Sequence, residues 1–221
     1  MRSNLEIIYK IIVFLAILFV AFLISCNDVN YNYMSGTLTD MVTGEPIANA
    51  KVEFEITEIV SGSFYSAFSP FKETYTDEQG NYLIEFESRN FVKMKMIFAK
   101  DDFHTVSTIF DPEGVGYDYV VDEIIPKESY ISFKIHNSVP YSNDDVLKLR
   151  ILNINEDCDV CAGSDYRYFY GDLVDTVIVC KVVGGESVTV NYISIHDDIP
   201  NIVENQVYCT PSDTVMYNCY Y

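Results

Sequence analysis

Residues 34–55 read MSGTLTDMVTGEPIANAKVEFE and decide the fold. A short strand is predicted over 35–39. Residues 40–46 (DMVTGEP) are typical of a turn, because glycine accepts positive φ and proline fixes φ. The next segment alternates strictly, with Val52, Phe54 and Ile56 on one face and polar or charged residues on the other. This period of two predicts a half-buried antiparallel strand.

The pattern repeats further along the chain. A second turn signal, TDEQGNY at 76–82, leads into a strand that places Ile84 and Phe86 on one face. We expect Asp40 and Asp77 to hydrogen-bond local backbone amides in these turns. Further strands are predicted over 92–96, 106–110 and 117–125, about seven in all, as in a β-sandwich.

These residues resemble the carboxypeptidase regulatory-like domain, a transthyretin-like sandwich. The matching positions are Gly36, Leu38, Asp40, Gly44, Pro46, Ile47, Ala50, Val52, Thr76, Asp77, Gly80 and Tyr82. The resemblance implies an accessory module that performs no chemistry, and its motif residues are turn and core residues. Residues 60–70 form an insert of unknown role between the second and third predicted strands.

The second half repeats the sandwich pattern without a comparable family motif. Strands are predicted over 130–135, 146–152, 165–170, 176–182, 187–195, 207–209 and 214–221. The predicted fold class is therefore all-β: two Ig-like or transthyretin-like β-sandwich domains in tandem, at 33–125 and 126–221, after a lipoprotein signal peptide. One larger continuous β-structure is the alternative.

The N-terminal sequence predicts where the protein is located. Residues 1–25 have a basic start, an apolar run over 11–24 that is short for a membrane span, and a small residue before Cys26. Leu23-Ile24-Ser25-Cys26 resembles a bacterial lipobox, which implies a signal peptide over 1–25, lipidation of Cys26 and a short tether over 26–32. An ordinary secretory signal or an uncleaved anchor is the alternative. We expect an outer-membrane lipoprotein of the cell envelope. Whether it faces the cell surface or the periplasm is left open by the sequence.

The composition limits the classes of partner that the protein is expected to bind. The formal net charge of −19 disfavours nucleic acid, which attracts Lys/Arg patches. An exported chain can keep disulfides. With Cys26 lipidated, five candidate disulfide cysteines remain in the second domain, and their pairing stays open: Cys158, Cys161, Cys180, Cys209 and Cys219.

Few residues suggest a site. Tyr166, Tyr168 and Tyr170 share one strand face; exposed, they are a candidate ligand face, and buried, which is the more common arrangement, they are core. The single CxxC at 158–161 lacks the second pair of a zinc site, and residues 153–164 do not meet the EF-hand pattern. A looser calcium site that uses Asp157 and Asp159, or Asp144 and Asp145, stays open. No motif of a hydrolase or peptidase is present, and His196 with the two aspartates after it is more typical of a solvated loop.

The sequence thus predicts a non-catalytic β-sandwich binding or accessory module that engages a glycan or an envelope protein, held to the membrane by a lipid anchor and without a cofactor or metal. A structural or assembly subunit of an envelope complex is the alternative. The final predicted strand, 214–221, is a candidate unpaired edge for such assembly.

Overall fold

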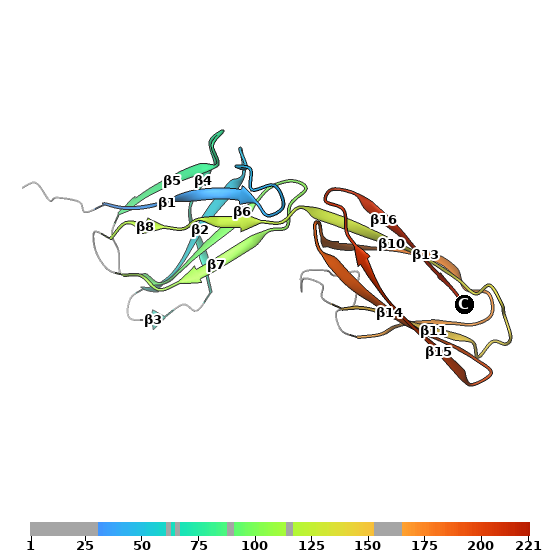
Figure 1. Ribbon diagram of the computed structural model, residues 1–221. Coiled ribbons are helices and arrows are strands. Elements are labelled where there is room, and N and C mark those ends of the chain that lie inside the picture. The colour runs from blue at the N-terminus through green and yellow to red at the C-terminus, as the bar shows by residue number, and fades with distance from the viewer. Residues whose placement is uncertain (1–30, 61–62, 65–66, 88–90, 114–116, 153–164) are drawn as a thin grey trace, which may run out of the picture.

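The computed structural model describes residues 31–60, 63–64, 67–87, 91–113, 117–152 and 165–221. Those residues form strands, turns and loops and no helix, so the described part of the chain is all-β as predicted. Two β-sandwiches follow one another end to end (Figure 1). Within the described ranges, no helix has the length and hydropathy to cross a membrane.

The first sandwich contains nine strands in two sheets. One sheet has the order β5-β1-β8, with β9 also paired to β1, and the other has the order β3-β2-β6-β7, with β4 also paired to β2. The strands are β1 (Tyr31–Asp40), β2 (Lys51–Val60), β3 (Ser63–Phe64), β4 (Ser69–Tyr75), β5 (Asn81–Glu87), β6 (Phe91–Ala99), β7 (Val106–Phe110), β8 (Tyr119–Val120) and β9 (Glu123–Ile125).

The core of this sandwich follows from the alternation seen in the sequence. Over residues 51–56 of β2 and throughout β5 every second side chain is buried, including the residues that the pattern predicted to face inward. Phe54 lies at the centre, with its ring centroid 5.6 Å from Phe71, 5.1 Å from Phe86 and 6.1 Å from Phe91. Such edge-on and tilted aromatic pairs add to the stabilisation from burial alone.

The two predicted turns have the expected geometry. Gly44 and Gly80 have φ values of 68° and 75°, a region that glycine enters without a Cβ penalty. One carboxylate oxygen of Asp40 accepts two backbone N–H groups of its turn, at 2.7 and 3.1 Å. Asp77 does the same at 2.9 and 2.8 Å. These residues of the sequence motif therefore shape connections.

The second sandwich has sheets of the orders β13-β10-β16 and β12-β11-β14-β15. The final strand β16 pairs in parallel with β10 and lies at the edge of its sheet, where the sequence placed a candidate edge. The strands are β10 (Glu128–His136), β11 (Val146–Leu152), β12 (Arg167–Tyr170), β13 (Asp175–Val183), β14 (Ser187–His196), β15 (Ile199–Tyr208) and β16 (Thr214–Tyr220).

Each sandwich has its own hydrophobic core. One cluster of buried residues runs from Met34 to Ile125, and the other from Ile131 to Tyr221. In the second cluster the inward side chains of β10, among them Phe133, pack against those of β11 and β14. Two separate cores support two independently packed units rather than one continuous β-structure.

The junction between the sandwiches carries direct bonds. The buried His104 places Nε2 3.0 Å from the carbonyl oxygen of Val182, across the junction. The backbone N–H of Glu128 donates to Asp102 at 2.8 Å. Lys127, in the connection between β9 and β10, forms an ion pair of 3.1 Å with Asp40. The connection is thus tied to both units.

Candidate functional site

The tyrosines singled out by the sequence lie on the outer face of the sheet β12-β11-β14-β15. Tyr168 and Tyr170 are 47% and 70% exposed, whereas Tyr166 is half-buried. The rings of Tyr168 and Tyr170 are parallel, with an interplanar angle of 8° and centroids 5.9 Å apart. The more common arrangement, burial of all three rings, is therefore not the one adopted. Phe169 between them turns inward and packs against the core.

Two cations lie over these rings. The register of β11 against β12 places Lys148 opposite Tyr168, and its Nζ lies 5.6 Å from that ring centroid. Arg150, two residues further along β11, holds its guanidinium 4.5 Å from the ring of Tyr166. Cation–π attraction of this kind fixes the orientation of both partners. The face therefore combines exposed aromatic surface with positive charge, in a chain whose net charge is strongly negative.

A buried amide organises the adjoining polar groups. Asn191 on β14 accepts through Oδ1 from the Tyr166 hydroxyl at 2.7 Å and from Arg150 Nε at 3.1 Å. Its Nδ2 donates to Glu204 on β15 at 3.1 Å. We call these seven residues the tyrosine face: Lys148, Arg150, Tyr166, Tyr168, Tyr170, Asn191 and Glu204. The network joins β11, β14 and β15 to the residue just before β12, so its polar groups are held in fixed positions before any ligand arrives.

Sequence reasoning did not find the four partners of the tyrosines. Lys148 and Arg150 alternate with the buried residues of β11, which is the signal that they point outward. Which strand faces them is a matter of register between residues far apart in the sequence. Asn191, only 4% exposed, gave no signal at all.

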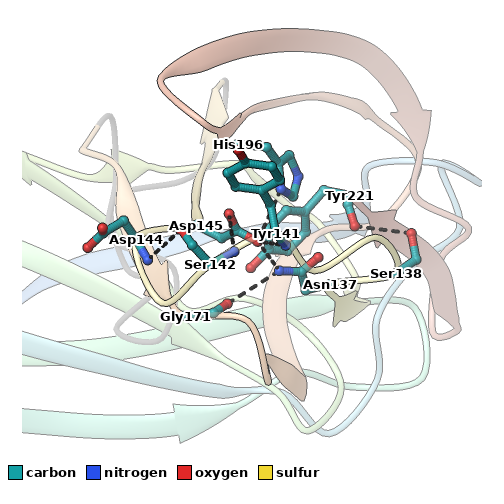
Figure 2. Close-up of polar contacts among 9 residues, drawn as sticks. All are labelled: Asn137, Ser138, Tyr141, Ser142, Asp144, Asp145, Gly171, His196 and Tyr221. Carbon is teal, nitrogen blue, oxygen red and sulfur yellow. Dashed lines mark hydrogen bonds and ion pairs between the residues drawn. The ribbon is translucent and has the colours of Figure 1, made fainter.

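A second polar cluster joins loops at one end of the second sandwich (Figure 2). The Asp145 side chain is fully buried and accepts from Asn137 Nδ2 at 2.9 Å and from the backbone N–H groups of Tyr141 and Ser142 at 2.8 and 3.3 Å. Its backbone carbonyl accepts from the N–H of Gly171 at 2.8 Å. Asp145 therefore ties the loop over 137–145 to the chain after β12.

His196 completes this cluster. Its Nδ1 lies 3.2 Å from Asp145 Oδ2, and its ring packs 5.3 Å from that of Tyr221. Burial tends to raise the pKa of Asp145, but the donors from Tyr141, Asn137, Ser142 and His196 outweigh it, so the pKa is lowered. The pair therefore joins the end of β14 to the loop over 137–145.

The cysteines correct one expectation. Cys209 and Cys219 are free, buried thiols inside the second core, although both had been counted as candidate disulfide partners. Burial raises the pKa of both, that of Cys219 to about 12, so they are protonated at neutral pH. Cys180 takes part in a disulfide, whereas Cys158 and Cys161 lie outside the described residues.

Two other predicted sites have little structural support or lie outside the structure. Cys26 is not among the described residues, so its lipidation stays a prediction. Of the part of the chain that is described, no group of three or more His, Cys, Asp or Glu side chains is placed to hold a metal ion. The carboxylate oxygens of Asp145 in particular already accept hydrogen bonds from protein donors. Asp157 and Asp159, the other acidic residues of the predicted calcium site, lie outside the described residues.

Comparisons with known proteins give distant fold similarities. No family model matches the sequence, and no curated protein matches it. The TIE protein of Bacillus anthracis is similar with a TM-score of 0.37 and 11% identity over 86% of this chain and 34% of that one. GBS52, the minor pilin of Streptococcus agalactiae, gives 0.37 and 12% over 86% and 94%.

A catechol 1,2-dioxygenase from Acinetobacter gives a TM-score of 0.35 and 15% identity over 47% of this chain and 54% of the enzyme. This chain thus spans about a third of the TIE protein and about half of the dioxygenase. At such scores the similarity supports no argument about this chain. The resemblance of 33–125 to the carboxypeptidase regulatory-like domain stays a prediction.

Proposed function

We propose that this protein is a non-catalytic binding module of the cell envelope and that its tyrosine face engages a glycan. The observation that carries the proposal is the pair of exposed, parallel rings of Tyr168 and Tyr170 beside a pre-formed polar network. Apolar ring surface suits the C–H face of a sugar, and the hydroxyl, guanidinium and carboxylate groups nearby suit its hydroxyls.

Pre-organisation favours this reading. Arg150, Tyr166 and Glu204 are already bonded to Asn191, so ligand binding does not have to order them. Lower ordering cost leaves more of the contact energy as affinity. Lys148 and Arg150 further favour a glycan that carries carboxylate or sulfate groups, because they are the cations of this face.

The experiment is a glycan array followed by calorimetry on the variant Y168A/Y170A. Truncating aromatic anchors at the centre of a contact costs about 2 kcal/mol or more, a loss of roughly 30-fold in affinity. Tyr75→Ala is the matched control, because Tyr75 is 57% exposed on β4 of the first sandwich. Unchanged glycan affinity in the double variant would refute the assignment of this face.

The envelope address belongs to the same proposal. Lipidation of Cys26 would leave four residues between the anchor and β1, which begins at Tyr31. The resemblance of the first domain to carboxypeptidase regulatory-like modules supports an accessory role beside the anchor. Cys26→Ala should release the protein from membranes, and persistent tight association would contradict this part. Protease accessibility on intact cells decides which membrane face the sandwiches occupy.

An assembly role is the second candidate, favoured by the other outer face of the second sandwich. Val177 and Val179 on β13 and Met216 and Tyr220 on β16 are 44–61% exposed there. The edge strand β16 offers unpaired backbone groups beside this apolar surface, and such edges invite strand addition. Crosslinking in whole envelopes tests it: loss of a specific crosslinked product in Met216→Lys, with glycan binding intact, would support an assembly role of this face that is separate from glycan binding.

A further inference from the structure

The first sandwich has a cavity between the edges of its two sheets. β7 ends one sheet, and β8 and β9 border the other; Thr108 on β7 donates to Glu123 on β9 at 2.7 Å across the gap. Next to this bridge lies an open cavity of about 380 Å³, which we call the edge cavity. Its lining includes Thr108, Phe110, Glu113, Tyr117, Tyr119 and Asp122.

Aromatic rings form one part of its wall. The Tyr119 ring lies 5.8 Å from Phe110 and 5.0 Å from Tyr117, the latter edge to face. Tyr119 is buried and its hydroxyl accepts from the backbone N–H of Glu113 at 2.8 Å, which fixes the ring. Tyr117 is 46% exposed and borders the opening. The buried Tyr119 ring also stacks 6.4 Å from Phe86, so the exposed Tyr117 ring is the one that can offer its negative face to a cation.

Negative charge forms another part. Glu113 and Asp122 contribute carboxylates, and the lining holds no lysine, arginine or histidine. Asp122 Oδ1 accepts from the backbone and hydroxyl of Thr37 at 2.8 and 2.9 Å, so this carboxylate has a defined position. Consistently, burial and the charges of Asp122 and Glu123 raise the pKa of the adjacent Tyr82. The local potential is therefore negative.

We propose that the edge cavity binds an organic cation, an alkylammonium or guanidinium group, between the exposed Tyr117 ring and the carboxylates. A bare metal ion fits less well, because ring faces and two carboxylates do not supply the six or more oxygen ligands that a calcium ion takes. An anion is disfavoured by both carboxylates. A free amine and a lysine or arginine side chain of a protein partner present the same chemistry. The site is independent of the tyrosine face.

The test is an NMR titration of the purified full-length chain, following the backbone amides of Glu113, Tyr117 and Asp122. The probes are choline and its neutral isostere 3,3-dimethyl-1-butanol. We expect choline to shift these amides and to bind about tenfold tighter, since only choline gains the charge interactions. Equal affinity for the neutral alcohol, or no shift with choline, would overturn the proposal.

A second pair of probes separates the sources of the cation. Nα-acetyl-lysine amide carries the side-chain ammonium, and the Nα,Nε-diacetyl form lacks its charge. Binding of the charged lysine derivative alongside choline supports a site that also accepts protein side chains. Binding of choline alone supports a small-molecule site.

Variants locate the interaction. Tyr117→Leu should weaken choline about two- to fivefold, the range of an exposed cation–π contact. Asp122→Asn should weaken it while keeping the oxygen that accepts from Thr37. Tyr75→Leu and Asp198→Asn are the matched controls for ring and charge, because both positions lie outside the cavity. Equal effects of the control and cavity variants would refute the site.

Discussion

Replacing Phe54 by alanine tests whether the two sandwiches are energetically separate. Phe54 is fully buried and its ring contacts three other phenylalanine rings of the first core. Removing a buried phenylalanine side chain costs about 3–5 kcal/mol of unfolding free energy. That is a large fraction of the roughly 5–15 kcal/mol that stabilises a domain. We therefore expect the first sandwich to unfold at much lower urea concentration.

The second sandwich should lose much less. The hydrogen bonds that tie β10 and β13 to the first sandwich include those from Glu128 N–H to the Asp102 carbonyl and between His104 and Val182. At about 0.5–1.5 kcal/mol each, these two contribute about 1–3 kcal/mol, which the second sandwich loses once the first has unfolded. Hydrogen exchange read by mass spectrometry at increasing urea reports each sandwich by its own peptides. This matters because the chain has no tryptophan to report unfolding by fluorescence.

Phe133→Ala is the matched variant, since Phe133 is also fully buried and packs 5.7 Å from Tyr217 in the second core. It should reverse the pattern, with the second sandwich losing protection first. If either variant lowers the protection of both sandwiches equally in a single transition, the two cores are one cooperative unit and the reasoning fails.

Three further predictions concern single residues. Asp145→Asn should reduce the loss of stability at acid pH. The lowered pKa of Asp145 gives stability that is present above its usual pKa of 3.8 and is lost as the pH falls below that value. Circular dichroism at decreasing pH measures this loss, and an identical loss in the variant and the parent protein would contradict the prediction. Cys209 and Cys219 should stay unreactive toward a thiol reagent in the native protein at neutral pH, because burial keeps both protonated, and they should react after urea is added. Rapid labelling of either thiol in the native protein would contradict this. Gly80→Ala should lower the urea midpoint of the first sandwich more than Gly44→Ala, which costs about 1–2 kcal/mol for its positive φ alone. A Cβ at Gly80 meets the Leu38 carbonyl oxygen at 2.6 Å, whereas one at Gly44 meets nothing within 4 Å; equal midpoints would refute the argument.

Much of the fold could be predicted because its signals are local. Alternation in β2 and β5 and the turn residues around Gly44 and Gly80 depend on neighbours within one strand or turn. The prediction was incomplete at β15, where only 207–209 was expected and the structure has Ile199–Tyr208. Most side chains of this edge strand are exposed on both faces, so no alternation marks it. The strand β4, which follows the predicted insert in the chain, was missed because most of its side chains are likewise exposed.

The candidate site was predictable only in part. Period two placed Tyr166, Tyr168 and Tyr170 together, but whether a strand face is covered depends on which sheet packs over it. The link from Arg150 to Asn191 joins residues 41 positions apart and needs the register of β11 against β14. The free state of Cys209 and Cys219 likewise depends on three-dimensional placement, which spacing in the sequence does not contain.

The parallel strand pairs have a mechanical consequence. β9 runs parallel to β1, and β16 runs parallel to β10. The chain therefore enters the first sandwich through β1 at one end and leaves through β9 at the other, along the length of the molecule (Figure 1). Tension along this axis slides β1 past its partners, so the hydrogen bonds between them are loaded together in shear instead of opening one by one. A protein held at its N-terminal end while a partner pulls on its second sandwich is thus built to resist extension.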